Sequence, residues 1–337
     1  MKVLFLGGTG TISTSCVAEA IEQGLDVYVL NRGQSKRRPI AAGAKVILGD
    51  AYSDEDLLNA ISGHGIEVVA DFLCFDGQAA KRMVRLLAGK VKQYVFIGTA
   101  SSYQKPIHKH PITESSPLSP TGLSHYSQLK IDAEDVFNRA YVNDQFPVTT
   151  VRPSHTYDDA SPPLIGDWTN WDRVLKGKPV FVSGDGTNLW TVTHAEDFAV
   201  GFVGLLGNWP AIGEDFHITS QESPTWEEIY ANIGMATGVT PKVLKLTGEQ
   251  IKKIMPDWFW ADQILGDLSH TAIFDNTKIK KFVPRFNPKI TWVEGARRLH
   301  SWHQKNHSQL VIDAEVSGIF DRVSEAHART AQSLESF

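Results

Sequence analysis

The sequence has few cysteines, no long apolar run and no excess of positive charge. Cys16 and Cys74 are the two cysteines among its 337 residues, and so low a content is typical of a reducing compartment rather than of a disulfide framework. No stretch of about 18 apolar residues occurs, which argues against a membrane span. The apolar run at the N-terminus is too short for a signal peptide. We therefore expect a cytoplasmic protein with no membrane partner.

The charge balance and the positions of potential metal ligands argue against two further classes of function. Lys and Arg number 33 and Asp and Glu 38, which gives a formal net charge of -5. Nucleic-acid binding as the main activity needs a net basic face, so we expect no nucleic-acid partner. Cysteines and histidines do not occur at the spacings of zinc sites, so no metal site is predicted.

Short β-rich runs alternate with helical patterns in the first half of the chain. Strands are expected at Val3–Leu6, Val27–Leu30, Lys45–Leu48, Val68–Asp71, Tyr94–Ile97 and Pro147–Val151. Such alternation predicts an α/β fold with a doubly wound parallel sheet and right-handed crossovers. We expect a dinucleotide-binding domain over residues 1–155, to which some later segments return. A smaller α/β substrate lobe is expected mainly over residues 156–307, and a helical tail over 308–337.

The second half mixes short strands with helices. Strands are expected at Val180–Val182, Leu189–Val192, Phe216–Thr219 and Lys242–Leu246, and helices at Ala195–Leu206, Trp226–Ala236, Glu249–Ile254 and Trp292–Gln304. Thr225 and Glu228 predict a capping box at the second of these helices. In the tail, one stripe of a helix is formed by Ile312, Val316, Ile319, Phe320 and Val323. We favour packing of this stripe on its own domain, with a homodimer contact as the alternative.

The segment Gly7–Ser13 follows the first expected strand and begins a helix. Glycines at such a turn let the backbone approach a pyrophosphate, which the free N–H groups of the helix N-terminus then bind. Ser13 stands where the pattern has its last glycine, and a residue this small should preserve the packing of helix on strand. The context of strand, glycine turn and helix therefore predicts a dinucleotide site.

The end of the second expected strand indicates which dinucleotide binds. A NAD site usually has a carboxylate there for the ribose 2′-hydroxyl, whereas this chain reads Asn31-Arg32-Gly33. Lys36, Arg37 and Arg38 follow closely. A planar guanidinium at Arg32 suits a 2′-phosphate, although these basic residues could also form a solvated loop. We expect NADP, with NAD as the alternative.

A tyrosine and a lysine lie four residues apart in an expected helix. This spacing puts Tyr126 and Lys130 on one face. A phenol is a poor base near neutral pH unless a cation stabilises the phenolate, and Lys130 is placed to supply that cation. Thr99, just past the fifth expected strand, is the candidate to orient the reacting oxygen, with Ser101 as the second choice. These residues predict proton exchange with a substrate while a hydride moves to or from a nicotinamide.

The motifs occur in an order that resembles the extended short-chain dehydrogenases/reductases, in the NAD-dependent epimerase/dehydratase group. The matching pieces are Gly7–Ser13, Gly49-Asp50, Thr99–Tyr103, Tyr126–Lys130, Val151–Tyr157, Gly184-Asp185-Gly186 and His194–Asp197. They cover about residues 1–305. The resemblance implies a Rossmann-type domain, a smaller C-terminal substrate lobe and a catalytic set of Thr99, Tyr126 and Lys130.

The cofactor contacts are expected along the carboxyl edge of the sheet. Asp50, at the end of the third expected strand, is placed for the adenine amino group, while Ser53 is the better cap of the next helix. The full expected set is Gly7, Thr9, Gly10, Thr11, Ile12, Asn31, Arg32, Asp50, Ala51, Phe72, Leu73, Tyr126, Lys130, Pro153, Ser154 and His155.

The chain departs from the family where the substrate would bind. Relatives that use nucleotide-diphosphate sugars carry an arginine shortly before the His-x-x-Asp element, where this chain has Leu189 and Trp190. An aromatic ring can stack on a sugar but cannot neutralise a phosphate. The expected substrate residues are Ser101, Tyr103, His155 and Trp190, with Thr99, Ser154 and His194 as further candidates.

Two classes of function remain open from the sequence. The first is an NAD(P)-dependent oxidoreductase or epimerase that transfers a hydride at a hydroxyl or carbonyl carbon of a sugar-like or polyol substrate. The alternative is a non-catalytic NAD(P)-binding sensor or an RNA-binding protein on the same scaffold. The Tyr126–Lys130 pair favours the enzyme.

Overall fold

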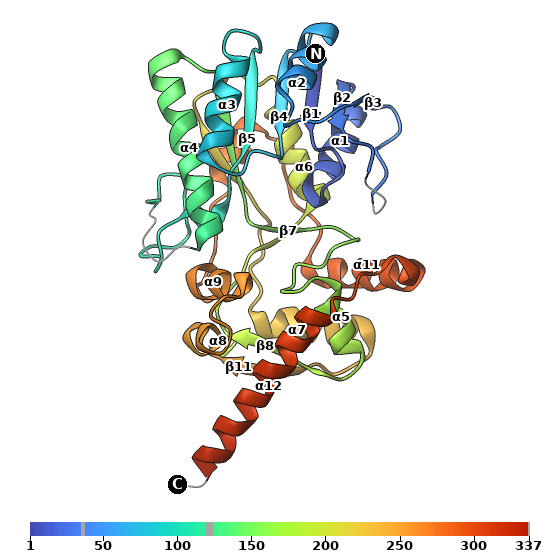
Figure 1. Ribbon diagram of the computed structural model, residues 1–337, viewed down its shortest axis with the longest axis vertical. Helices are drawn as coiled ribbons and strands as arrows, with labels where there is room; N and C mark the ends of the chain where they lie inside the picture. Colours follow the sequence, from blue (N-terminus) through green and yellow to red (C-terminus); the bar gives the residue numbers. More distant parts are fainter. Residues whose placement is uncertain (35–37, 119–123, 336–337) are drawn as a thin grey trace.

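A parallel sheet is the central feature of the computed structural model, which describes residues 1–34, 38–118 and 124–335 (Figure 1). It has seven strands in the order β10-β6-β5-β4-β1-β2-β3. Their bounds are β1 (Lys2–Leu6), β2 (Asp26–Asn31), β3 (Lys45–Leu48), β4 (Val68–Asp71), β5 (Gln93–Ile97), β6 (Val148–Pro153) and β10 (Asp215–Ile218). The strand order reverses between β1 and β4, and ligands bind at such a point in open α/β sheets. The predicted doubly wound α/β fold is confirmed.

Helices cover both faces of the sheet because successive side chains of a strand point to opposite faces. Val3 and Phe5 of β1 pack in one core with α1 (Thr11–Glu22), α6 (Ala195–Val203) and α10 (Thr277–Phe282). Leu4 and Leu6 pack in the other core. The helices of that second face are α2 (Asp54–His64), α3 (Gly77–Leu87) and α4 (His125–Asp144). The strand β10 and the helices α6 and α10 are later segments that return to the first domain.

The remaining elements form a second lobe below the sheet (Figure 1). They are β7 (His155–Tyr157), α5 (Trp168–Leu175), β8 (Pro179–Ser183), β9 (Val192–His194), α7 (Trp226–Thr237), β11 (Lys242–Leu246), α8 (Gly248–Ile254), α9 (Phe259–Gln263), the π-helix η3 (Ile264–Leu268), α11 (Trp292–Lys305) and α12 (Ala314–Glu335). Short 3₁₀ turns occur at η1 (Ala100–Ser102), η2 (Trp209–Ala211) and η4 (His307–Gln309). The lobe has its own core, in which Trp168, Trp171 and Trp292 are fully buried.

Two helix caps agree with the sequence and one strand differs. Ser53 accepts a hydrogen bond from the backbone of Asp56 at the start of α2, and Thr225 forms a capping box with Glu228 at α7. The strand expected at Leu189–Val192 is displaced to Val192–His194. Leu189 and Trp190 instead form isolated bridges to Thr225 and Ala272, because this segment pairs with loops rather than with a neighbouring strand.

The tail helix α12 divides into a packed half and a projecting half. Ile319, Phe320 and Val323 are buried in the core of the lobe, as the amphipathic stripe predicts for packing on its own domain. Ile312 precedes the helix and is 39% exposed. Beyond Val323 the helix extends away from the lobe (Figure 1). Within the described ranges, no helix is both long enough and apolar enough to span a membrane.

Candidate active site

The glycine turn between β1 and α1 leaves no room for side chains. Gly7 has φ +81°, and a Cβ there would lie 2.9 Å from Leu73 Cδ2. At Gly8 a Cβ would lie 2.6 Å from Val29 Cγ1. Ser13 is buried and accepts a hydrogen bond from Gly10 N at 2.9 Å, so the serine both preserves the packing and fixes the turn. The first backbone N–H groups of α1, including those of Thr11 and Ile12, have no partner within the helix.

A cavity of about 400 Å³ opens beside this turn at the carboxyl ends of β1 and β2. Its lining includes the expected cofactor residues Gly7, Thr9, Asn31, Arg32, Asp50, Ala51 and Leu73, together with Tyr52. Asn31 Oδ1 accepts from Gly33 N at 2.9 Å, and Asp50 Oδ1 accepts from Tyr52 N at 3.0 Å. A cavity next to the N-terminus of α1 suits a dinucleotide: the N–H groups of α1 would bind its pyrophosphate, and Arg32 and Asp50 would contact its adenosine end.

The basic residues after β2 differ in their surroundings. Arg32 is exposed at the rim of the cavity. Arg38 instead forms a two-point ion pair with Asp158 of the second lobe, with Nη2 2.8 Å from Oδ1. Lys36 and Arg37 lie outside the described residues. Arg32 is therefore the described basic residue of this group that faces the expected ribose position.

Phe72 and Leu73 continue the cofactor cleft from β4, but they face different ways. Leu73 lines the cavity, whereas the Phe72 ring packs in the core against Phe5 and Phe202, with centroids 6.1 Å and 5.2 Å away. The Phe72 side chain therefore does not line this cavity, and a cofactor contact at Phe72 stays a prediction. The ring is drawn into the apolar core because it follows a buried strand.

Lys130 lies one turn after Tyr126 on α4 and is buried. Its ammonium donates to the carbonyl oxygens of Cys74 at 2.7 Å and Ile97 at 2.8 Å. It also lies 4.4 Å from the centroid of the Phe75 ring. Burial lowers the pKa of Lys130 to about 8. The lysine thus hydrogen-bonds the loop after β4 and the end of β5, next to Leu73, which lines the cavity at the glycine turn.

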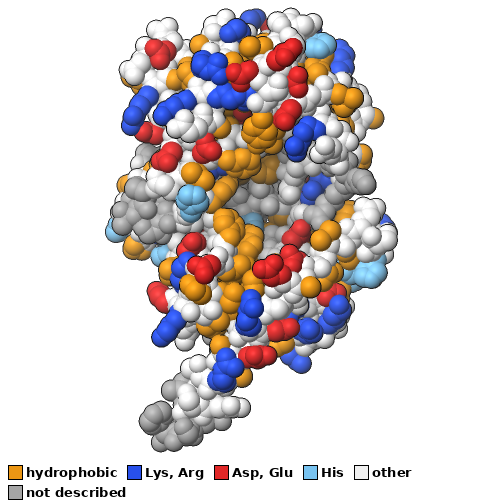
Figure 2. Space-filling view, in the orientation of Figure 1, with side chains coloured by type: hydrophobic (Ala, Val, Ile, Leu, Met, Phe, Trp, Pro, Cys, Tyr) orange, Lys and Arg blue, Asp and Glu red, His pale blue; other side chains and the backbone are white. Residues whose placement is uncertain are grey.

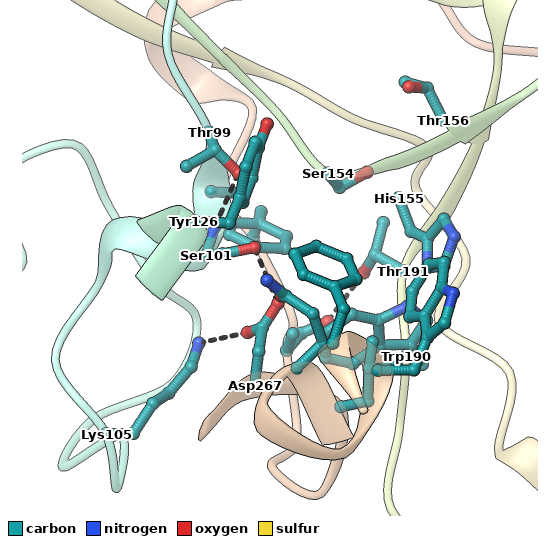
Figure 3. Close-up of a pocket in the computed structure, with 17 residues that line it drawn as sticks. Thr99, Ser101, Lys105, Tyr126, Ser154, His155, Thr156, Trp190, Thr191 and Asp267 are labelled. Atoms are coloured by element: carbon teal, nitrogen blue, oxygen red, sulfur yellow. Dashed lines mark hydrogen bonds and ion pairs between the residues drawn. The ribbon is translucent and has the colours of Figure 1, made fainter. Parts of the chain in front are cut away.

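Tyr126 and Thr99 face a second cavity, of about 270 Å³, between the sheet edge and the second lobe (Figure 3). Burial raises the pKa of the Tyr126 phenol, while a hydrogen bond with the Thr99 side chain opposes the rise. The net direction is upward and burial is its main cause, while stabilisation of the phenolate by Lys130 stays a prediction. The ammonium of Lys130 is directed to two backbone carbonyls.

Residues from both lobes line this second cavity, which we call the substrate pocket. They include Thr99, Ser101, Lys105, Tyr126, Ser154, His155, Thr156, Trp190, Thr191, Phe259, Trp260, Gln263, Asp267 and Phe274. Figure 2 shows that apolar side chains lead into the hollow between the lobes. Aromatic walls with a few polar groups are typical of small-molecule sites.

A buried polar network lies in the substrate pocket. Asp267 Oδ2 accepts from Ser101 Oγ at 2.6 Å, and Asp267 Oδ1 pairs with Lys105 Nζ at 3.0 Å. The side chains of Lys105 and Asp267 are 2% and 6% exposed. Asp267 belongs to the π-helix η3, a local irregularity that is frequent at functional sites.

His155 and Trp190 form the opposite wall of the substrate pocket (Figure 3). The indole Nε1 of Trp190 donates to His155 Nδ1 at 3.2 Å. Burial lowers the pKa of His155 to about 4, so the ring is neutral near pH 7. Because Nδ1 is the acceptor, the ring proton is on Nε2.

Two expected substrate residues lie outside the pocket. Tyr103 is fully buried, and its hydroxyl is 3.0 Å from Arg152 Nη1 and 3.2 Å from His217 Nδ1. Its hydroxyl therefore contacts β6 and β10 inside the fold and does not face the substrate pocket. His194 is also buried and acts as the N-cap of α6, with Nε2 3.1 Å from Asp159 Oδ1. Both predictions are wrong because polar groups inside the fold satisfy these side chains.

Pro153 and Ser154 lie close to the positions that the sequence predicts. Pro153 ends β6, and Ser154 lines the pocket with its hydroxyl 2.7 Å from Thr193 Oγ1. The residues that sequence reasoning missed are Lys105, Phe259, Trp260, Gln263, Asp267 and Phe274. They lie outside every motif, and the concentration of tryptophans near Trp258 and Trp260 is the only signal that pointed to that segment.

These features define an extended short-chain dehydrogenase/reductase fold with a cleft at the glycine turn and a separate pocket between the lobes. Residues 3–218 match the model of the NAD dependent epimerase/dehydratase family. The match covers more than half of the chain, and the chain belongs to this family.

The known proteins that are similar to this chain have names that describe different functions. The chloroplast stem-loop binding protein of 41 kDa b from Arabidopsis thaliana is 26% identical over 313 residues, which are 87% of this chain and 77% of that protein. Among solved structures, the epimerase Mth375 from Methanothermobacter thermautotrophicus matches with a TM-score of 0.74 at 17% identity, covering 91% of this chain and 93% of the other. The dTDP-glucose 4,6-dehydratase from Bacillus anthracis in complex with NAD matches with a TM-score of 0.73 at 21% identity, over 91% and 98% of the chains.

Proposed function

We propose that this chain is a nicotinamide-dinucleotide-dependent oxidoreductase or epimerase that acts on a hydroxyl or carbonyl carbon of a sugar-like or polyol substrate. The observation that carries the proposal is the joint placement of Tyr126 and Thr99 in a pocket that both lobes line. Lys130 lies one turn after Tyr126 and donates to the carbonyl of Cys74, which follows Leu73 of the cleft at the glycine turn.

The residues of the chain support a proton transfer coupled to hydride transfer. The chemistry that a nicotinamide would supply, if held in the cleft, is acceptance or return of the hydride, with a positive charge on the ring in its oxidised form. Tyr126 takes the proton from a substrate hydroxyl when the carbon is oxidised and returns it when the carbonyl is reduced. Thr99 orients the reacting oxygen, and Lys130 keeps a positive charge behind the tyrosine. Epimerisation uses both directions of the same step.

The cofactor is proposed to be NADP(H) in preference to NAD(H). The second strand ends without a carboxylate at the ribose position, and Arg32 lies exposed at the rim of the cleft. A guanidinium binds a 2′-phosphate through paired hydrogen bonds. The family description and the similar dehydratase structure name NAD, so NAD(H) is the alternative for this chain.

The test of the proposed chemistry is Tyr126→Phe, which keeps the ring and removes the titrating hydroxyl. We expect turnover to fall by roughly 10²–10⁴, as for the loss of a general acid or base, while folding and cofactor affinity stay nearly unchanged. A screen of sugars, polyols and nucleotide sugars by nicotinamide absorbance and product isomer analysis identifies the substrate first. Thr99→Val, which removes an orienting group, should be milder. Wild-type turnover in Tyr126→Phe would contradict the proposal.

A second candidate function is RNA binding, since the plant relative is named a stem-loop binding protein. The net charge of -5 disfavours it. Figure 2 likewise shows acidic and basic side chains interspersed on the face that contains the hollow, rather than a basic stripe. Fluorescence anisotropy with a labelled RNA hairpin at about 0.15 M salt tests it, and saturable binding would favour this candidate.

A further inference from the structure

We propose that Ser101, Lys105 and Asp267 form a hydroxyl-binding subsite that selects an uncharged polyhydroxylated ring over a nucleotide-diphosphate sugar. This inference rests on the proposed function, because it names the substrate class of the same pocket. Ser101 comes from η1 after β5, whereas Asp267 comes from η3 of the second lobe. The subsite therefore forms where the two lobes meet, beside Tyr126 and Thr99 (Figure 3).

The charge of the pocket argues for an uncharged ligand. Among the described residues that line it, Lys105 and Asp267 are the charged groups, and they neutralise each other across 3.0 Å. A diphosphate would need an uncompensated Arg or Lys to replace its hydration. An ammonium already committed to a buried carboxylate does not supply this charge.

The hydrogen-bonding groups of the subsite match sugar hydroxyls. Lys105 Nζ is buried and, apart from the ion pair, has no hydrogen-bond partner among the described residues. Asp267 Oδ2 accepts one hydrogen bond from Ser101, and Asp267 Oδ1 pairs with Lys105. Each carboxylate oxygen can therefore accept another hydrogen bond. A pair of hydroxyl groups can donate to the carboxylate and accept from the ammonium at the same time. The subsite thus offers both a hydrogen-bond donor and a hydrogen-bond acceptor to the hydroxyl groups of a polyol.

The walls and the size of the pocket agree with a single ring. Phe259 and Trp260 lie at the pocket with ring centroids 5.6 Å apart, and such surfaces pack against the apolar faces of a sugar. The cavity of about 270 Å³ is slightly smaller than the roughly 300 Å³ at which the range for small-molecule sites begins, so it suits a small ligand. His155 adds a neutral N–H donor on the opposite wall. Asp267 also lies close enough to Tyr126 for its charge to raise the pKa of the phenol.

The experiment is calorimetric titration of the full chain, with oxidised cofactor present, using six probes. They are the uncharged D-glucose, D-galactose and myo-inositol, the anions D-glucuronate and D-galacturonate, and UDP-glucose. In the wild type we expect an uncharged ring to bind more tightly than the uronates and UDP-glucose. Asp267→Asn should weaken that ring at least about tenfold, as expected for a lost charged hydrogen bond. The same variant should shift preference towards the uronates, because it leaves Lys105 uncompensated.

The controls separate this effect from misfolding and from other charges. Asp262→Asn on α9 removes a carboxylate that pairs with Lys252 at 2.8 Å on the surface, and we expect its titrations to match the wild type. Ser101→Ala keeps the buried ion pair, so it should fold if Asp267→Asn does not, and it should weaken the same ring. Tighter binding of UDP-glucose than of every uncharged ring would overturn the inference, as would absence of binding by any uncharged ring or equal effects of the Asp267 and Asp262 variants.

The same titrations distinguish the two proposals. If an uncharged ring binds and depends on Asp267 but yields neither a change in nicotinamide absorbance nor an isomeric product, the proposed chemistry fails and the subsite stands. If UDP-glucose alone is oxidised, reduced or epimerised, in a reaction that depends on Tyr126, the proposed chemistry stands and the subsite fails.

Discussion

Burial decides the protonation of the residues proposed to exchange a proton with the substrate. The pKa of Lys130 is lowered to about 8 and that of Tyr126 is raised, both because burial disfavours the charged form. At neutral pH the lysine is therefore charged and the tyrosine neutral. A neutral phenol can donate to a carbonyl without rearrangement, so the site is ready for the reductive direction. Oxidation needs further positive charge, which an oxidised nicotinamide supplies.

The cofactor preference is tested at a single residue, Arg32. Arg32→Ala should weaken NADP(H) binding by roughly 1–3 kcal/mol, because one charged hydrogen bond to the 2′-phosphate is lost. NAD(H) lacks that phosphate, and its affinity for the variant should stay close to that of the wild type. Calorimetry on the cofactor-free protein measures both affinities, and NAD(H) serves as the internal control. If the wild type binds both cofactors equally, or binds NAD(H) more tightly, the proposed preference for NADP(H) is wrong.

Sequence reasoning placed correctly the residues whose position depends on a local motif. Gly7, Thr99 and Tyr126 follow directly from strand ends and helix spacing, and the structure places them at the two cavities. It failed at Tyr103, which has the same local context as Ser101. Tyr103 is turned inward by Arg152 and His217, whose positions depend on β6 and β10. The direction of a side chain set by such distant elements cannot be deduced from local spacing.

At the scale of elements, the parallel sheet was predictable and the second lobe was predictable only in outline. The strands of the sheet are continuous apolar runs because helices cover both faces, and the structure finds β1 to β6 at the expected places within a few residues. The lobe contains short elements such as β7 and the π-helix η3, whose patterns are too short to show a period. Asp267 lies on such an element, so its role in the pocket emerges only in three dimensions.

The tail helix provides a prediction at the element scale. Truncation after His307 removes Phe320 from the lobe core and Asp321 from its ion pair with the buried Arg173, 2.8 Å away. We expect an unchanged oligomeric state in sedimentation and a marked loss of thermal stability, since Phe320→Ala alone should cost roughly 3–5 kcal/mol. Truncation after Arg329 removes only the projecting end and should have little effect. A shift towards monomer in the His307 truncation would instead show that the helix is a subunit contact.

For the whole molecule, polar links as well as apolar packing hold the sheet domain and the second lobe together. Arg38 of the first domain pairs with Asp158 of the second, and Ser101 donates to Asp267 across the substrate pocket. Within the first domain, Tyr103 contacts His217 of β10, whose Nε2 hydrogen-bonds the carbonyl of Asp275. Because several of these links are charged or titratable, the stability of the fold should depend on pH.

The histidine of that last link should make the protein sensitive to acid. Burial lowers the pKa of His217 to about 4, below the value of about 6.5 for an exposed histidine. Its neutral ring accepts from Tyr103 and donates to Asp275, with Arg152 and Glu114 also nearby. The unfolded chain binds the proton first as the pH falls. The contribution of the neutral His217 ring to the free energy of unfolding is therefore complete above about pH 6.5 and is lost as the pH falls towards about 4.

The size of this loss can be measured by denaturant unfolding at a series of pH values. A pKa lowered from about 6.5 to about 4 corresponds to about 3 kcal/mol from this residue once the pH is below both values. His217→Gln offers an amide oxygen to Tyr103 and an N–H to Asp275 without a titrating group, so its stability should fall less between about pH 6.5 and about pH 4. His108→Gln changes an exposed histidine and serves as the matched control. If His217→Gln retains the full acid sensitivity of the wild type, other buried groups, such as His155, determine it.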